Sequence, residues 1–456
     1  MRIRIHLGLA AAILCMAGAR AAEPDFAAAA ARAEASRDER MAWWREARFG
    51  MFIHWGLYSV AADDWPGIPN GRYSEWLMSR GVPHEEYRRE LTRRFDPNAY
   101  DPAAWAALAR EAGMQYVVLT TKHHEGFSLW DSAATDYDVA DNTPCGRDML
   151  APFVEAVRAA GLRVGFYYAI LDWYHPDYVP RRKDNDSRPP AEPEVFGRYL
   201  DFMERQVREL LTGYGRVDVL WWDGGWEHNA EEQRAARLNG LAYALQPHIL
   251  LGDRNGLPGD FATPEQKLPD PLPQRDWESC LTINGSWGYH RRDRNWKSSE
   301  ELIRTLSLTA TGGGNLLLNV GPDANGVIPE PQVTRLKEIG RWMRAHAPAI
   351  RGTARWPLAG GTPWGGGTVR VRPDGSGSLY LHLHRPSDAG SARLSGVRVE
   401  PKHIRWLEAL AGAQASGELT PDADLVVRWN ALPGAPAVAV IELEFDRPFL
   451  PAPELP

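Results

Sequence analysis

The chain of 456 residues is long enough for more than one domain, and its 24% charged and 44% hydrophobic residues are ordinary for a soluble globular protein. Its formal net charge of -7 argues against a nucleic-acid partner, because phosphate binding needs a basic surface. The 19 Trp are unusual, and they serve either burial or a pocket that stacks on the apolar faces of sugars.

Residues 1–21 have the pattern of a signal peptide: Arg2 and Arg4 near the start, an apolar run over residues 7–16, and small residues at positions 19 and 21. The apolar run is too short to span a membrane. We therefore expect export to the periplasm or the extracellular space, with no membrane association after cleavage. An uncleaved membrane anchor is the alternative. The two cysteines that remain, Cys145 and Cys280, fit neither a disulfide framework nor a zinc site.

From about residue 26 to residue 346, amphipathic helical stretches alternate with short apolar runs. The expected helices cover residues 102–112, 149–160, 195–211, 229–245 and 299–310. The strands that follow them are expected at residues 116–119, 164–168, 217–222, 248–251 and 315–320. Repeated units of this kind predict a parallel sheet covered on both faces. Since no Gly-x-Gly-x-x-Gly loop follows a strand, we predict an α/β fold, a (β/α)8-like barrel over residues 22–350.

The pattern changes after Arg351, where helical periodicity stops and short alternating strands begin. The clearest of these strands are expected at residues 368–371, 378–383 and 437–445, separated by Gly and Pro turns. They predict an antiparallel β-sandwich over residues 351–456. Its expected role is scaffolding of the barrel, with independent sugar binding as the alternative.

Catalytic groups of a barrel gather where the strands end, on the carboxyl face. At the end of one predicted strand, Asp223 follows Trp221 and Trp222 and precedes a Gly pair. A carboxylate held between indoles is positioned and partly desolvated, as a nucleophile needs to be. The alternative role, capping the next helix, is disfavoured because that helix is predicted to begin near Asn229. Asp223 is therefore the leading candidate for a catalytic nucleophile.

A general acid has to come from elsewhere on the rim. Glu265 lies in a loop-like stretch, and Glu278 follows it closely. A loop is a suitable position for an acid that must reach a leaving-group oxygen and then activate water. The residues themselves do not choose between the two glutamates. The one that is not catalytic would pair with an arginine or close the loop.

Three histidines, His54, His123 and His124, also lie at predicted strand ends and raise the question of a metal. A metal-dependent barrel hydrolase needs three or four convergent ligands, and it typically shows a His-x-His or His-x-x-x-His pair that is absent around these positions. Neutral imidazoles are also good hydrogen-bond partners for sugar hydroxyls, and a buried structural role is open to any one of them. We therefore expect no metal ligand in this set.

Taken together, the motifs resemble the α-L-fucosidases of glycoside hydrolase family 29 over nearly the whole mature chain. No single piece is decisive, but the ordered set is specific. The motifs are Trp43 to Gly50, Phe52-Ile53-His54-Trp55-Gly56, Tyr73-Ser74-Glu75-Trp76, Lys122 to Phe127, Trp221-Trp222-Asp223-Gly224, Trp277-Glu278, Ser286 to Tyr289 and Gly313 to Pro322.

This resemblance implies an exo-acting, retaining enzyme without a cofactor, in which Asp223 matches the nucleophile. For the acid/base, Glu265 ranks first because its segment looks like the place where several members keep this residue, and Glu278 ranks second. Trp287 looks like a wall against the fucose methyl group. The sugar-binding positions that carry over are His54, Glu75, Trp76, His123, His124, Tyr168, Trp221 and Arg254.

The implied substrate is a fucosylated oligosaccharide or glycoconjugate, and assembly into a homo-oligomer is left open. Two other classes compete with this interpretation: the metal-dependent hydrolase, and a non-catalytic sugar-binding protein that keeps the pocket. The latter would lack one of the carboxylates, whereas both a nucleophile and candidate acids are present here.

Overall fold

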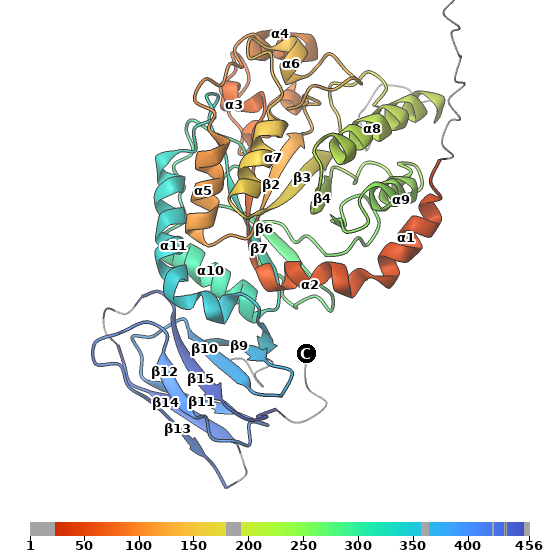
Figure 1. Cartoon of the computed structure of the whole chain (residues 1–456). Helices are drawn as coiled ribbons and strands as arrows, with labels where there is room; N and C mark the ends of the chain where they lie inside the picture. Colours follow the sequence, from red (N-terminus) through yellow and green to blue (C-terminus); the bar gives the residue numbers. More distant parts are fainter. Residues whose placement is uncertain are drawn as a thin grey trace, which may run out of the picture.

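The computed structural model describes residues 23–178, 193–356, 364–421, 424–432, 434 and 436–450 (Figure 1). The predicted signal peptide, residues 1–21, lies outside the described residues. Across the ranges just given, the helices are too short or too polar to pass through a bilayer.

Seven parallel strands form one curled sheet in the first part of the chain. They are β1 (Phe49–Ile53), β2 (Tyr116–Lys122), β3 (Arg163–Ala169), β4 (Val219–Asp223), β5 (Leu250–Leu251), β6 (Glu278–Thr282) and β7 (Asn315–Val320). Their order in space is β5-β4-β3-β2-β1-β7-β6, with every neighbouring pair parallel. The predicted barrel is therefore confirmed, although its wall of strands is incompletely closed.

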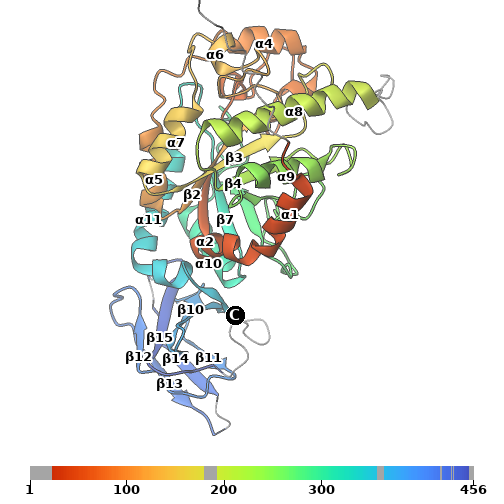
Figure 2. The same cartoon turned by 45° about the vertical axis from the view of Figure 1, so that its right-hand side comes forward.

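Helices surround this sheet, and the C-terminal sheets lie beyond one end of it in both views (Figure 1 and Figure 2). The α-helices are α1 (Phe26–Ala35), α2 (Arg37–Ala47), α3 (Tyr58–Ala61), α4 (His84–Thr92), α5 (Pro102–Ala112), α6 (Val139–Asn142), α7 (Leu150–Ala159), α8 (Pro193–Gly213), α9 (Ala235–Leu245), α10 (Ser299–Thr311) and α11 (Glu330–Ile350). Two single-turn 3-10 helices, η1 (Ser74–Trp76) and η2 (Met78–Arg80), lie between α3 and α4.

Most predicted helices agree with the structure to within two residues, but the one expected over residues 229–245 begins only at Ala235. The reason is local. The side chain of Asn229 accepts hydrogen bonds from the backbone of Glu231 and Glu232 at 3.0 and 2.9 Å, which makes a turn. Arg234 then adopts a left-handed conformation with φ 52°, so the helix cannot extend backwards through it.

The gap between β5 and β6 is spanned by residues 260–266, which occupy the place of an eighth strand without forming a regular ladder. Parallel bridges join Phe261 to Gly252, Ala262 to Trp277 and Glu265 to Cys280. The start of the segment is fixed by Asp260, whose carboxylate accepts from the backbone nitrogen of Leu251 at 2.8 Å. This segment carries the candidate acid Glu265.

Side chains along each strand alternate between the barrel interior and the layer under the helices. On β3, Tyr167 belongs to the interior cluster, whereas Phe166 and Tyr168 belong to the outer one. On β4, Trp221 is interior and Trp222 is exterior. The interior cluster also contains Met41 and Trp44 of α2, so this helix plugs the end at which the strands begin.

The C-terminal region is an antiparallel β-sandwich, as predicted. Its strands are β8 (Ala354–Trp356), β9 (Gly365–Val371), β10 (Gly377–Leu383), β11 (Gly390–Leu394), β12 (His403–Trp406), β13 (Ala415–Leu419), β14 (Leu425–Trp429) and β15 (Ala439–Phe445). Sheet β12-β15-β10-β9-β8 faces sheet β11-β14-β13 over a shared apolar core. Helices α10 and α11 pack against β8, β9 and β15, and Trp342 Nε1 donates to the carbonyl of Val438 at 2.8 Å.

One buried ion pair joins α2 to the segment of residues 260–266, and we predict that this pair is essential for stability. Arg40 Nη2 lies 2.7 Å from Asp260 Oδ1, and the two side chains are 5% and 2% exposed. Substitution of Arg40→Met leaves the Asp260 carboxylate buried without its cation, which should lower the free energy of unfolding by about 3–5 kcal/mol. Denaturant titration followed by tryptophan fluorescence measures this loss.

The matched control is Asp38→Asn, because Asp38 pairs with Arg45 through a side chain that is 86% exposed. Such a surface pair is worth about 0–1 kcal/mol. Equal stability of the Arg40→Met and Asp38→Asn proteins would contradict the assignment of the buried pair.

Candidate active site

One pocket opens at the carboxyl ends of the barrel strands. The residues lining it are Phe52, His54, Tyr73, Trp76, His123, His124, Tyr167, Trp221, Asp223, Trp226, Arg254, Glu265, Cys280 and Trp287. The sequence predicted most of these, apart from Phe52, Tyr73, Tyr167, Trp226 and Cys280. Three predicted site residues, Glu75, Tyr168 and Glu278, do not line it.

Asp223 is the last residue of β4 and is only 7% exposed. Its Oδ2 accepts a hydrogen bond from the Tyr167 hydroxyl at 2.7 Å, and its Oδ1 accepts from Arg254 Nη1 at 3.2 Å. His124 Nε2 is 3.6 Å from Oδ2, beyond hydrogen-bonding distance. Burial acts to raise the pKa of Asp223, but Arg254, His124, the Tyr167 hydroxyl and the backbone of Gly224 together hold it below its ordinary value. Asp223 is thus an enclosed but anionic carboxylate, as a nucleophile requires.

Glu265 lies on the pocket wall with a side chain that is 39% exposed. Arg254 Nη1 donates to Glu265 Oε2 at 2.7 Å and to Asp223 Oδ1 at 3.2 Å. Because both oxygens contact the same nitrogen, they lie no farther apart than the sum of these distances, 5.9 Å. Carboxyl groups about 5–5.5 Å apart are typical of retaining glycosidases, and about 6.5–9.5 Å of inverting ones. The upper limit of 5.9 Å between these two oxygens lies below the range of inverting enzymes.

Arg254 is itself held rigidly. Its Nε donates to Thr263 Oγ1 at 2.9 Å and its Nη2 donates to the Thr263 carbonyl at 3.0 Å. The guanidinium lies 4.8 Å from the centre of the Trp221 ring. Burial acts to lower the pKa of Arg254, but Asp223 and the other acidic groups raise it above its ordinary value. The cation between the two carboxylates is therefore permanent and fixed in position.

Glu278, the second candidate for the acid/base, lies at the opposite end of the barrel interior. It is the first residue of β6 and is 1% exposed. Its Oε1 accepts from Trp221 Nε1 at 3.1 Å, and its Oε2 accepts from the Tyr116 hydroxyl. Burial raises the pKa of Glu278 to about 7. Since both oxygens are bonded beneath the pocket, the geometry disfavours Glu278 as the acid/base and makes it a support for Trp221.

His54 is fixed in one tautomer by its neighbour. Asn319 Nδ2 donates to the Trp287 carbonyl at 2.7 Å, so Asn319 Oδ1 is the acceptor that faces His54 Nδ1 at 2.6 Å. Nδ1 must then carry the proton, which leaves Nε2 free to accept a hydrogen bond. Burial lowers the pKa of His54 to about 3, so the ring stays neutral.

His123 and His124 follow the end of β2, and their ring centres are 4.2 Å apart. Both therefore line the pocket from a loop, whereas neighbours within a strand would face opposite sides. Burial lowers the pKa of His124 to about 4 and that of His123 well below its ordinary value. The pocket thus presents neutral imidazoles beside a single carboxylate–arginine cluster.

Tyr168 needs a correction, since it does not reach the pocket. Its hydroxyl donates to Gln206 Oε1 at 2.8 Å in the outer layer, and Lys122 Nζ lies 4.8 Å from its ring centre. The neighbouring Tyr167 has the opposite orientation and contacts Asp223. The alternation of a strand explains the error, because a shift of one residue exchanges the two faces. In the structure Ala169 pairs with Asp223, and Tyr167, two residues before it, lies on the same face of β3, so the register of β3 against β4 decides which tyrosine faces the pocket.

Glu75 is fully buried behind the part of the pocket wall that Trp287 forms. Its Oε2 accepts from the backbone nitrogen of Gly288 at 3.0 Å, next to the wall residue Trp287. Its Oε1 has no hydrogen-bond partner within the part of the chain that the structure describes. Burial raises the pKa of Glu75 to about 7. Direct contact of Glu75 with a sugar stays a prediction.

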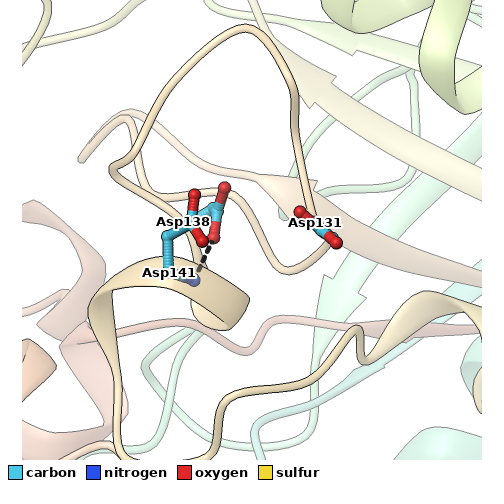
Figure 3. A group of neighbouring side chains, drawn as sticks. All are labelled: Asp131, Asp138 and Asp141. Carbon is cyan, nitrogen blue, oxygen red and sulfur yellow. Dashed lines mark hydrogen bonds between the residues drawn. The ribbon is translucent and has the colours of Figure 1, made fainter.

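Away from this pocket, Asp131, Asp138 and Asp141 bring carboxylate oxygens within 4.8 Å of one another (Figure 3). Their arrangement has a local cause. Asp138 Oδ1 accepts from the backbone nitrogens of Ala140 and Asp141 at 2.9 and 2.8 Å, and so caps α6. Asp131 and Asp141 are exposed, and Asp138 has a structural role as the N-cap of α6.

The paired carboxylates in an aromatic pocket at the carboxyl end of a barrel define a glycoside hydrolase. Comparison with known proteins agrees. The family model described as "Alpha-L-fucosidase" matches residues 15–348. The tissue α-L-fucosidase of Homo sapiens is 30% identical over 418 residues, which span 86% of this chain and 85% of that protein.

Solved structures are similar over the same extent. The α-L-fucosidase isoenzyme 1 from Paenibacillus thiaminolyticus is 38% identical with a TM-score of 0.73, and the match covers 90% of this chain and 100% of that chain. An α-L-fucosidase of Bacteroides thetaiotaomicron is 31% identical with a TM-score of 0.75, covering 89% of this chain and 96% of that chain. The chain belongs to the α-L-fucosidases of glycoside hydrolase family 29.

The two adjacent tyrosines of β3 provide a matched test of the site. Tyr167→Phe removes the hydrogen bond to Asp223 Oδ2, which helps to lower the pKa of that carboxyl. The pKa of Asp223 should therefore rise, the acidic limb of kcat/KM should move to higher pH, and kcat/KM should fall about 10- to 100-fold. A pH profile on an aryl α-L-fucoside measures both effects.

Tyr168→Phe is the control, because it loses one hydrogen bond to Gln206 outside the pocket. We expect lower thermal stability with an unchanged acidic limb. A shift of the limb in Tyr168→Phe but not in Tyr167→Phe would reverse the assignment.

Proposed function

We propose that the chain is an exo-acting, retaining α-L-fucosidase that removes terminal α-L-fucosyl groups by double displacement. The observation that supports this proposal best is the shared contact of Arg254 Nη1 with Asp223 and Glu265, which limits the separation of their oxygens to 5.9 Å. That spacing suits a nucleophile and an acid/base on either side of one glycosidic bond, without room for an inverting water.

In the first step, Asp223 attacks the anomeric carbon of the fucosyl group while Glu265 gives its proton to the glycosidic oxygen. The bond to the leaving group breaks as the Asp223–carbon ester forms, and the leaving group departs as an alcohol. In the second step, the Glu265 carboxylate takes a proton from water, the water oxygen bonds to the anomeric carbon, and Asp223 leaves as a carboxylate. Two inversions give net retention.

Arg254 has a defined part in both steps. Before the first step the negative charge is on Asp223, and after it the charge is on Glu265, because one becomes an ester as the other loses its proton. The same guanidinium nitrogen contacts both oxygens, so the cation balances either charge without moving. This preorganisation avoids the cost of rearranging a counter-charge during the reaction.

The shape of the pocket suits a single terminal sugar. Its floor is formed by the buried side chains Phe52, Tyr167 and Trp221, which close the barrel interior below it. Trp287 lies stacked on His54 with ring centres 4.9 Å apart and presents an apolar surface. We propose that Trp287 contacts the methyl group of fucose, where a hydroxymethyl group would be less favourable.

A related structure supports the covalent mechanism. The Bacteroides thetaiotaomicron fucosidase has been captured as a trapped covalent intermediate with 2-fluoro-fucosyl fluoride, with the help of a Glu-to-Gln mutant. In the present chain, Asp223 is the enclosed anionic carboxylate that could form such an ester, and Glu265 is the glutamate on the pocket wall.

The nucleophile assignment predicts that Asp223→Ala lowers kcat on an aryl α-L-fucoside by about 10³-fold or more. In the unmodified protein, 2-fluoro-fucosyl fluoride should label residue 223, as located by peptide mass spectrometry. Asp218→Asn is the control, since Asp218 lies just before the same strand and pairs with Arg163 at 3.0 Å. An adduct on a different residue would sink the assignment.

For the acid/base, we predict that Glu265→Ala loses activity mainly on substrates with poor leaving groups and that azide rescues it, forming fucosyl azide. The control is Glu278→Gln, whose amide can still accept from Trp221 and donate to Tyr116 in place of the carboxylate. Azide rescue of Glu278→Gln, with none for Glu265→Ala, would overturn the ranking of the two glutamates.

A further inference from the structure

The rim of the catalytic pocket is distinct from its interior. Of the residues that line it, only Trp76, Trp226 and Glu265 are exposed, and the others are buried or half-buried. Trp226 is 53% exposed and Trp76 is 36% exposed. Exposed indoles are costly to solvate, so two of them beside one pocket mouth call for an explanation.

Trp226 is held in place by the backbone on both sides of it. Gly225 N donates to the Arg254 carbonyl at 3.2 Å, and a Cβ on Gly225 would come within 2.3 Å of that same carbonyl oxygen. On the other side, Glu227 accepts from the Tyr178 hydroxyl at 2.9 Å. The exposed ring is therefore carried by a fixed segment that follows directly from Asp223.

The two exposed indoles flank one imidazole. The ring of His124 packs edge-to-face against Trp226, with centres 5.4 Å apart and planes at 87°, and against Trp76, with centres 5.8 Å apart and planes at 84°. The same His124 has its Nε2 3.6 Å from Asp223. The rim indoles are thus one ring away from the reacting carboxylate, with part of their surface left to solvent.

The position of Glu265, the proposed proton donor, indicates which part of the substrate would contact the rings of Trp76 and Trp226. Glu265 must contact the glycosidic oxygen, which joins the fucosyl group to the rest of the substrate. With the fucosyl group enclosed, the remainder leaves through the mouth where Glu265, Trp76 and Trp226 are the exposed residues. A flat apolar surface there is suited to an aromatic ring or to the apolar face of a pyranose.

We propose that Trp226 is a binding platform for the leaving group, selecting substrates in which the group next to fucose presents a flat apolar face. This inference rests on the proposed fucosidase activity. It adds a specificity-determining residue outside the sugar-binding positions assigned above, with Trp76 beside it on the same rim.

The test compares substrates with and without a leaving group that can reach Trp226. For Trp226→Ala, kcat/KM should fall about tenfold or more on an aryl α-L-fucoside and on a fucosyl disaccharide. On α-L-fucosyl fluoride, whose leaving group is one atom, it should change less than about twofold. Trp226→Phe keeps a flat ring and should recover most of the loss. Inhibition by free fucose, which fills the enclosed part alone, should be unchanged.

Each outcome has a distinct meaning. Equal losses on the disaccharide and the fluoride would place Trp226 in the fucosyl pocket and overturn the platform. Unchanged rates on all three substrates would also overturn it. Failure of the unmodified protein to hydrolyse even the fluoride would instead contradict the proposed function, so the two ideas fail separately.

Discussion

The half-buried guanidinium of Arg254 organises the electrostatics of the pocket. It contacts the oxygens of Asp223 and Glu265 through one nitrogen, and its remaining nitrogens are fixed by Thr263. Charges of this kind are stable in a desolvated pocket only when they are paired and hydrogen-bonded. The fold meets this requirement by placing the end of β4 and the 260–266 segment on either side of the same guanidinium.

The rest of the pocket is kept neutral, which concentrates the electrostatic effect on that cluster. His54, His123 and His124 all have pKa values lowered by burial, so none competes with Arg254 as a cation. Asn319 donates to the Trp287 carbonyl and accepts from His54 Nδ1. These bonds fix His54 Nε2 as a hydrogen-bond acceptor without adding charge. Such groups can recognise hydroxyls by orientation without adding a second charged centre to the pocket.

The fold was largely predictable because amphipathic helices and apolar strands leave strong periodic signals. The segment over residues 260–266 left none, since it pairs only through isolated bridges and contains Pro264. Without it, the sequence could not show that Glu265 reaches the carboxyl face. Nor could it show that β6 starts at Glu278, which puts this glutamate at the amino end. The two glutamates therefore differ in the end of the strands at which they lie, and residue type alone does not distinguish them.

Tyr167 and Tyr168 illustrate a different limit. Both residues lie in one apolar strand and have the same chemistry, so only the register of β3 against β4 decides which faces Asp223. Buried parallel strands are apolar on both faces and therefore hide this parity. Asp223 itself was easier to identify, because a carboxylate after two indoles is conspicuous at any register.

The C-terminal sandwich contributes no residue to the pocket, whose described lining ends at Trp287, but it contacts the helices that support it. Thr368 Oγ1 donates to the carbonyl of Ala349 at 2.7 Å, so it must accept from His382 Nε2 at 3.0 Å. His382 Nδ1 then carries no proton and accepts a hydrogen bond from Ser307 Oγ at 2.9 Å. Burial lowers the pKa of His382 to about 3, which preserves this neutral arrangement.

That hydrogen-bond chain joins the sandwich to α10 and to the end of α11. Helix α10 leads directly into β7, and β7 carries Asn319, which orients His54 in the pocket. The sandwich is therefore linked through α10 to the strand that carries Asn319, without contributing a residue to the described pocket lining. Buried polar groups that are all hydrogen-bonded fix two packed elements relative to each other, which is the kind of junction that the predicted scaffolding role requires. The role itself stays a prediction, and independent sugar binding stays its alternative.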